Sequence, residues 1–552
     1  MKTVSKKLSL ILAAITAAGS LSACSDSPSS STASEPSASE SSAASASSAE
    51  SGGEEGAAGV TYPLEGNPTF TYAIGEEAAV TVNATDLGAT PFGQAWQEAT
   101  GVTLEVQHPS GNDGFNLLFA SGDLPDIINW KFTTYSGGPT KAIKDGIIYP
   151  IEDLIEENAP DLKAVLDSND LYRKSTTSVD GHIVGFPFIR GSEYLLTAAG
   201  MVIRDDWLDE LGLEKPQTPD ELYEVLVAFR DEKGATIPAT GELNTILGHW
   251  VNYGMITSGF GLVKGDFYQV DNVVHYGRAE QEYKDVLAYL NRLYEEKLLD
   301  QNFNTINSST KDSNLMNGLS GVSGASVGGG IGNYLQTMEG KDFSITGFGP
   351  LVAKEGDKAK STYYDNPVTG HMAVITPNCE NKEAAAQFLN YGYTEEGHML
   401  FNFGIEGESY TMVDGVPTYT ELITHNPDGW TMQQALAQYT RSWATDAFVQ
   451  DEGYMRQYGA RPQQQEALES WTNTDAAKYA FPPTTIAEEN SAEYSKLWSD
   501  LNTYMDEMFV KFVTGVEPLD KFETDYLPML EQLGIDRVLE LQQNALDEFN
   551  AR

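Results

Sequence analysis

Hydrophobic and polar positions follow strand and helix periods in turn along the early part of the chain. Apolar and polar residues alternate at 80–83, as in a half-buried strand, and 92–100 has a helical pattern. Strand patterns at 102–106 and 126–130 flank a second helical pattern at 114–121. This strand–helix–strand–helix–strand order predicts a parallel sheet with crossover helices, and therefore an α/β fold.

Parallel sheets of this kind bind ligands beyond the carboxyl ends of their strands. Asp86 follows the first predicted strand, and Trp130 ends the third. We therefore expect both residues, and the loops after them, at the edge of a site. Asp86 has a second interpretation, because an Asp in a loop also caps the segment that follows it.

Two later helices have clear local signals. Thr218 is placed as an N-cap, with Pro219 at the first helical position and Glu221 completing a capping box. Apolar residues then recur at helical spacing, and a second such stripe lies between Tyr283 and Tyr294. Stripes of this kind predict core packing. The C-terminal third is mostly helical in pattern, with a last helix after Gly534.

The first 23 residues have the pattern of an export signal. Three lysines precede a short apolar run at 8–18, and small residues follow. The run ends in Leu21-Ser22-Ala23-Cys24, which matches the bacterial lipobox. We expect residues 1–23 to be a lipoprotein signal peptide and Cys24 to carry lipid. The alternative is a chance cysteine beside an ordinary cleavage site.

Residues 24–59 predict a flexible tether after the lipidated cysteine. Positions 25–59 contain 14 Ser, eight Ala and six acidic residues, with neither Lys nor Arg. Such a segment buries too little apolar surface to offset its ordering entropy. Together with Cys24, it predicts a protein tethered outside the cytoplasmic membrane, on a Gram-positive cell surface.

Composition excludes several classes of function. The chain has 552 residues, and 34 Lys and Arg against 80 Asp and Glu give a formal charge of −46. This acidity argues against nucleic acid and anionic membrane as partners. Two cysteines make neither a disulfide scaffold nor a Cys-rich zinc site. With Cys24 lipidated, Cys379 is predicted to be a small buried hydrophobic residue.

A series of short motifs resembles one known family. In order along the chain they are 120–128 (ASGDLPDII), 204–213 (RDDWLDELGL), 370–376 (GHMAVIT), 390–397 (NYGYTEEG), 404–410 (GIEGESY) and 512–519 (FVTGVEPL). These motifs follow a lipobox and a Ser-rich segment along the chain. Together they resemble the lipid-anchored extracellular solute-binding proteins of bacterial ABC importers, and among these the LipO-like oligosaccharide-binding group of family 1.

The resemblance implies a two-lobe periplasmic-binding-protein-like α/β fold with a hinge and a ligand cleft between the lobes. Lobe 1 would comprise 60–200 plus 370–425, and lobe 2 would comprise 201–369 plus 426–552. The implied function is capture of a carbohydrate, such as an oligosaccharide, by a monomer that delivers it to ABC permease subunits. No cofactor and no covalent chemistry are expected. The acidic chain accommodates a neutral glycan more easily than a strongly anionic one.

One motif of the family is missing. Many relatives carry a Ca²⁺ loop of alternating Asp and Asn just after the capped helix. The corresponding stretch here, 229–238, is too short and too poor in carboxylates for the six to eight oxygen ligands that Ca²⁺ takes. We therefore predict no metal there.

Sugars need flat aromatic rings against their apolar faces and planar polar groups at their edges. Trp130 resembles the cleft-edge Trp of maltose-type binders, although a core position is the alternative. Arg190 and Glu193 follow a strand where relatives cross between lobes and present ligand contacts. A plain surface ion pair is the alternative for these two.

Further candidates come from turn-rich stretches. Trp250, Asn252 and Tyr253 lie between glycines, where stacking on a sugar competes with a core role. Tyr363 and Tyr364, followed by Asp365, lie in an exposed turn before a returning strand. Trp430 and Trp443 lie where relatives supply aromatic residues from the second lobe.

The sequence gives weaker support to an enzymatic function. Residues 324–328 satisfy G-x-S-x-G, but a nucleophile elbow needs a helix next, and the sequence continues with a glycine-rich run. The seven histidines show no metal-binding spacing. A lipid-anchored glycoside hydrolase is the enzyme alternative. A binding protein that serves a sensor, or one that binds peptides, is the other.

Overall fold

The structure is a computed structural model that describes residues 59–75 and 77–552. The predicted signal peptide, the predicted lipidation site Cys24 and nearly all of the predicted tether lie outside these residues. None of the helices in the two described stretches combines the length and the apolar character that crossing a bilayer requires.

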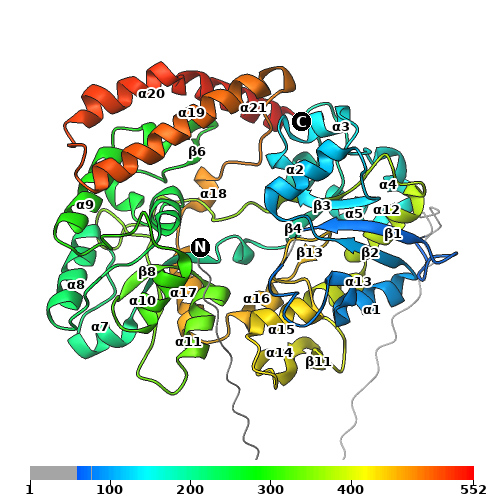
Figure 1. Ribbon diagram of the computed structural model, residues 1–552, viewed down its shortest axis with the longest axis horizontal. Coiled ribbons are helices and arrows are strands. Elements are labelled where there is room, and N and C mark those ends of the chain that lie inside the picture. The colour runs from blue at the N-terminus through cyan, green and yellow to red at the C-terminus, as the bar shows by residue number, and fades with distance from the viewer. Residues whose placement is uncertain (1–58, 76) are drawn as a thin grey trace, which may run out of the picture. The chain divides into compact units, whose positions relative to one another are not determined.

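The first sheet has six strands in the order β13-β4-β10-β3-β1-β2 (Figure 1). β1 pairs in parallel with β2 and β3, whereas β10 runs antiparallel to β3 and β4. The helices α1 (Pro91–Thr100) and α2 (Gly111–Ser121) make the two crossovers, which confirms the predicted order. The strands are β1 (Thr69–Ile74), β2 (Thr103–Gln107), β3 (Ile127–Lys131), β4 (Phe186–Arg190), β10 (Val368–Ile375) and β13 (Val449–Gln450).

The strand predicted at 80–83 was wrong, since these residues form consecutive turns. The backbone N–H groups of Val80 and Thr81 both donate to the carbonyl of Glu77. Only Val80 is buried, and Val82 is 41% exposed, so the alternation does not describe two faces of a sheet. The first strand is instead β1, whose Tyr72 and Ala73 point to opposite faces.

Helices cover both faces of the first sheet. On one face Tyr72, Ile127 and Ile375 pack with apolar residues of α1, α4, α5, α12 and α13. On the other face Ile128 and Val374 pack with α2 and α3. The bounds are α3 (Gly138–Lys144), α4 (Glu152–Asn158), α5 (Pro160–Ser168), α6 (Asp170–Thr176), α12 (Lys382–Asn390) and α13 (Glu395–Phe403).

A second, antiparallel sheet has the order β8-β5-β9, with β5 (Ala199–Ile203), β8 (Val322–Ser326) and β9 (Thr346–Phe348). Trp471 of α17 (Pro462–Thr472) donates from Nε1 to the carbonyl of Met201, 3.1 Å away. A Cβ atom on Gly200 would lie 2.4 Å from that nitrogen, so a glycine is required where the helix crosses the strand.

The capping box at Thr218 is confirmed at the start of α8 (Pro219–Asp231), and the apolar stripe at Tyr283 forms α9 (Tyr283–Glu295). The C-terminal third is helical as predicted, and α21 (Ile535–Ala551) begins after Gly534. The other helices in these parts are α7 (Asp205–Leu211), α10 (Ser308–Met316), α11 (Asn333–Thr337), α14 (Glu421–Thr424), α15 (Met432–Tyr439), α16 (Glu452–Tyr458), α18 (Ala476–Tyr479), α19 (Glu488–Val513) and α20 (Leu527–Leu533).

Two hairpins complete the described strands. They are β6 (Phe267–Val270) with β7 (Val273–Tyr276), and β11 (Tyr410–Val413) with β12 (Val416–Tyr419). Cys379 is buried beside the first sheet, with 1% of its surface exposed, as predicted for a small hydrophobic residue. Burial raises the pKa of its thiol to about 11.

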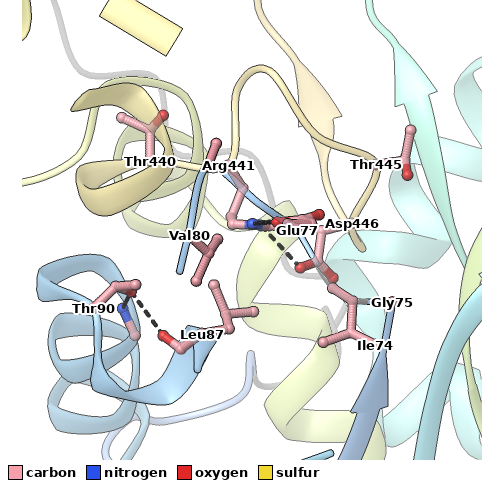
Figure 2. Close-up of polar contacts among 12 residues, drawn as sticks. Ile74, Gly75, Glu77, Val80, Leu87, Thr90, Thr440, Arg441, Thr445 and Asp446 are labelled. Atoms are coloured by element: carbon pink, nitrogen blue, oxygen red, sulfur yellow. Dashed lines mark hydrogen bonds and ion pairs between the residues drawn. The ribbon is translucent and has the colours of Figure 1, made fainter. Parts of the chain in front are cut away.

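A buried ionic network fixes residues 441–446 against the first sheet (Figure 2). Arg441, which is fully buried, donates to both carboxylate oxygens of Glu77 at 2.7 and 2.8 Å. Its Nε lies 3.3 Å from Asp446, which also accepts from the hydroxyl of Tyr72 and the amide of Asn129. The chain continues from this network into β13, which joins β4 in the first sheet.

Candidate ligand-binding site

A cavity of about 440 Å³ is lined by residues of the first sheet and by residues from other parts of the chain. The first sheet and the network segment contribute Lys131, Thr369, His371 and Thr445. Tyr253, Lys264 and Asp266 come from the part of the chain that surrounds the second sheet. The remaining lining residues are Thr362, Tyr363, Tyr364, Asp365, Asn366, Ala480 and Phe481.

Two tyrosines form an aromatic wall of this cavity. The ring centroids of Tyr253 and Tyr364 are 4.4 Å apart at an interplanar angle of 46°. His249 packs against both rings, with centroid distances of 5.9 and 6.1 Å. Tyr253 directly follows the π-helix η4 (Asn244–Asn252), and burial is the main cause of its raised pKa. The two rings therefore offer apolar faces to a ligand in the cavity.

Arg190 holds the turn that carries Tyr364. At the end of β4 its guanidinium donates to Asp365 from Nε at 2.9 Å and from Nη2 at 2.6 Å. Its Nη1 donates a third hydrogen bond to the side-chain oxygen of Gln450 in β13, at 2.8 Å. Glu193 lies instead near Tyr363, where burial and this carboxylate raise the pKa of the tyrosine to about 12. Arg190 and Glu193 therefore contact different partners rather than each other.

His371 supplies a neutral polar group to the cavity. It pairs with Lys131 across the antiparallel register of β10 and β3, and its Nδ1 is 3.2 Å from the hydroxyl of Thr445. Burial lowers the pKa of His371 to about 4, and the positive charges of Lys131 and Arg190 act in the same direction. The imidazole is therefore uncharged at neutral pH and both donates and accepts hydrogen bonds.

Two further hollows lie near the cavity and share wall residues with it or with each other. The second, of about 220 Å³, shares Tyr364 with the first and is also lined by Arg190, Gln433 and Trp443. The indole N–H of Trp443 is buried and has no hydrogen-bond partner among the described residues. The third, of about 390 Å³, shares Gly328 and Tyr458 with the second. The shared wall residues place the second hollow next to the cavity and the third next to the second.

The sequence-predicted site residues therefore divide into two groups. Tyr253, Tyr363 and Tyr364 line the cavity, and Arg190 and Trp443 line the second hollow. Glu193 lies next to Tyr363. Trp430 is partly buried against the larger core and lines none of the three hollows described above.

The other predicted residues lie in the protein interior or in a cap. Trp130 is 7% exposed and packs among Phe115, Phe119 and Phe132, while its neighbour Lys131 reaches the cavity. Trp250 is fully buried. Asn252 lines none of the three hollows. Asp86 accepts a hydrogen bond from the N–H of Ala89 at 3.0 Å, so it caps the short helix η1 (Leu87–Ala89).

The G-x-S-x-G stretch has a local structure that the sequence did not suggest. Ser326 ends β8, and the glycine-rich run after it is itself helical, as the π-helix η7 (Val327–Gly332). The expectation that no helix follows was therefore wrong. The run forms a wide helical turn, and its Gly328 lies against the Tyr458 ring, where a Cβ atom would not fit. Within the described part of the chain, we find no hydrogen bond that joins Ser326 to a histidine. The same part contains no cluster of three or more His, Cys, Asp or Glu residues placed to hold a metal ion.

Comparison with known proteins identifies the fold. Residues 83–399 match the family of bacterial extracellular solute-binding proteins. The chain belongs to this family. Lipoprotein LipO of Bacillus subtilis (strain 168) is 28% identical over 374 residues, which cover 64% of this chain and 70% of LipO. The fructooligosaccharide ABC transporter substrate-binding protein FusA of Streptococcus pneumoniae is 24% identical, over 89% of this chain and 93% of FusA.

Solved structures of solute-binding proteins agree in fold. The alginate-binding protein AlgQ2, crystallised without calcium ion, superposes with a TM-score of 0.69 at 23% identity and covers 89% of this chain and 100% of AlgQ2. FusA in complex with kestose superposes with a TM-score of 0.70 at 20% identity, over 88% of this chain and 99% of FusA. The chain therefore has the two-lobe periplasmic-binding-protein-like α/β fold that its sequence resemblance implied.

Sequence reasoning missed several cavity residues of this solute-binding protein. Lys264 and Asp266 are neighbours in the sequence, but His371 and Thr445 are far from them and from each other, and only the tertiary fold brings the four together. The sequence partly indicated His371, because this residue lies in the family-like motif at 370–376. Its position opposite Lys131 depends on the antiparallel register of β10 and β3, which no local pattern specifies.

Proposed function

We propose that this protein captures an oligosaccharide outside the cell and delivers it to the permease of an ABC importer. The observation that carries the proposal is the cavity, which combines the adjacent, tilted rings of Tyr253 and Tyr364 with polar groups suited to sugar hydroxyls. FusA, a relative over most of the chain, is a fructooligosaccharide-binding protein of such a transporter. Structures with the same fold include the alginate-binding protein AlgQ2 and FusA in complex with kestose.

The chemistry of the cavity matches the two sides of a sugar ring. Tyr253 and Tyr364 offer faces for the apolar C–H surface, and this type of contact contributes about 1 kcal/mol beyond simple burial. Asp266 and Asn366 supply hydrogen-bonding oxygens at the edges, and the neutral His371 donates or accepts. In our proposal Tyr363, Arg190 and Trp443 contact further sugar units along the three hollows.

Ligand capture closes the two lobes in this proposal. The lobes would comprise 60–200 plus 370–425 and 201–369 plus 426–552, with the crossing segments near Arg190, Asp365 and Thr445. β13 is an exception to this division, because it lies in the second range but pairs in the first sheet. A ligand that contacts both lobes binds the closed state more tightly and so shifts the population toward it. No covalent chemistry is required.

The proposed location is the extracytoplasmic face of the membrane. Cys24 would carry two acyl chains, and a dual anchor tethers a protein durably. Residues 24–59 would hold the folded part away from the membrane as a monomer, within reach of the permease. Mass spectrometry of the native protein tests the anchor, because a free thiol at Cys24 in the membrane-associated form contradicts it.

Isothermal titration calorimetry against a panel of oligosaccharides tests the proposal directly. We expect stoichiometric binding of at least one oligosaccharide to the chain that begins after the tether, without turnover of the sugar. Tyr364→Ala should remove most of the affinity, whereas a variant in the separate hairpin, Met412→Ala, should not. Reproducible hydrolysis of a sugar without stoichiometric binding would overturn the proposal.

A further inference from the structure

Two lysines from separate parts of the chain line the cavity. Lys131 ends β3 of the first sheet, and Lys264 lies in the loop before β6 of the β6–β7 hairpin. Neither ammonium has an ion-pair partner within 4.0 Å among the described residues, where many other lysines have one. Neither ammonium donates a hydrogen bond in that part of the chain. Both are therefore available to a ligand.

The environment of Lys264 makes an unpaired ammonium costly. The side chain is half-buried against the cavity, and burial lowers its pKa although the charge of Asp266 acts in the opposite direction. A desolvated cation without a bonded counter-ion is unfavourable unless an anion arrives to pair with it. A ligand that brings a carboxylate to this position would restore the missing partner.

The acidic side chains of the cavity do not offset the two lysines. Asp365 is already held by the guanidinium of Arg190, so its charge is neutralised. Asp266 accepts from the backbone N–H of Phe267 at 2.7 Å and forms no ion pair within 4.0 Å in the described residues. His371 is neutral. Among the described residues, the cavity lining therefore has two lysines without an ion-pair partner against one such carboxylate, Asp266, although the whole chain carries −46.

We propose that the ligand is an oligosaccharide that contains uronic acid residues, whose carboxylates are bound by Lys131 and Lys264. This inference rests on the proposed function and narrows its substrate class. Ammonium–carboxylate hydrogen bonds are shorter and stronger than neutral ones, so they discriminate an acidic sugar from its uncharged counterpart. The tyrosine wall accepts the ring face of either sugar, and the lysines select the charged one.

The experiment compares matched ligands and matched variants by titration calorimetry. The probes are trigalacturonate, its fully methyl-esterified form, alginate trisaccharides and neutral fructo-oligosaccharides. The proteins are the wild type, Lys131→Gln, Lys264→Gln and Lys264→Arg. Lys496→Gln, which removes an exposed charge on α19, is the control because Lys496 does not line the cavity.

We expect a uronate trisaccharide to bind more tightly than every neutral probe. Each Gln substitution should weaken that binding roughly tenfold or more, because a hydrogen bond to a charged group is lost. Lys264→Arg should retain more affinity than Lys264→Gln, and Lys496→Gln should match the wild type. If Lys264→Gln does not fold, Lys131→Gln and the ester comparison on the wild type decide the question.

The outcomes separate the inference from the proposed function. A neutral oligosaccharide that binds more tightly than any uronate probe overturns the inference and leaves the proposed function intact. Uronate binding that is unchanged in both Gln variants also overturns the inference alone. A complete absence of binding across neutral and acidic probes overturns both.

Discussion

The aromatic residues of this protein show how little side-chain type alone says about a binding site. Trp130 and Trp250 are the residue types most often found against sugars, yet both are enclosed by other core residues. Tyr253 and Tyr364 occupy the cavity instead, because they lie at the ends of irregular segments rather than within a packed stripe. Burial, rather than ring size, separates the two groups.

Substitution of these aromatics should therefore give opposite results. Tyr364→Ala should weaken oligosaccharide binding by about 1–2 kcal/mol, since it removes a stacking face, while Tyr364→Phe retains the ring. Trp250→Ala should instead lower the free energy of unfolding by about 3–5 kcal/mol through the cavity it leaves. Calorimetry and denaturant unfolding measure the two effects. Full stability in Trp250→Ala would contradict the core assignment.

Two buried histidines should make the protein sensitive to acid. Burial lowers the pKa of His249 and of His371 to about 4, whereas a histidine in the unfolded chain titrates near 6.5. Between these values the unfolded state binds more protons, so the free energy of unfolding falls as the pH is lowered. The loss is on the order of 2–3 kcal/mol for each histidine once the pH reaches the folded value.

Denaturant unfolding at a series of pH values from 7 to 4 measures this dependence. The double variant His249→Gln/His371→Gln should show a shallower decline than the wild type in that window. His425→Gln, at an exposed position, is the matched control. Equal slopes in the wild type and the double variant would contradict the prediction.

Among the elements, those with local signals were predicted and those that depend on long-range pairing were not. α8 begins at Thr218 because the capping box and Pro219 specify its start within four residues. The turns at 80–83 alternate like a strand, but their exposed Val82 has no sheet to join. β1 was missed, since its strand character depends on the neighbouring β2 and β3. For the same reason, the sequence alone did not predict Lys264 and His371 as site residues.

The segment that carries Arg441 should be a sensitive structural element. Arg441→Leu would leave Glu77 and Asp446 without their cation, and breaking a buried pair in this way costs about 3–5 kcal/mol. Glu493→Gln breaks an exposed pair with Arg537 and should leave the free energy of unfolding nearly unchanged, because solvent screens the pair. Urea unfolding compares the two variants. Similar losses in both would contradict a structural role for the network.

The π-helix η7 should control how the second and third hollows connect. A Cβ atom on Gly328 would lie 1.9 Å from the Tyr458 ring, so Gly328→Ala must displace that ring. On neighbouring Gly329 the nearest atom would be 3.3 Å away, at the end of the flexible Gln433 side chain. Gly328→Ala should therefore weaken binding of long oligosaccharides more than short ones, and Gly329→Ala should not. Titrations with a chain-length series test this difference.

At the scale of the whole molecule, the proposed ligand would contact segments from two parts of the chain that have separate hydrophobic cores. The cavity takes residues from around both, so ligand binding should stabilise the folded state as one unit. At a ligand concentration of a hundred times Kd the expected gain is about 2.7 kcal/mol. Differential scanning calorimetry should show this gain for the wild type. Tyr364→Ala at the same ligand concentration should show less, and an equal gain would contradict the assigned site.

The buried Cys379 has a practical consequence for fluorescence work on this protein. The sequence contains one other cysteine, Cys24, so a chain that begins after the tether has a single thiol. That thiol is enclosed beside the first sheet, and its high pKa leaves almost no reactive thiolate at neutral pH. A cysteine introduced at Gln433 on the wall of the second hollow would therefore take a maleimide dye selectively. The labelled protein would work as an optical sugar sensor without removal of the native cysteine.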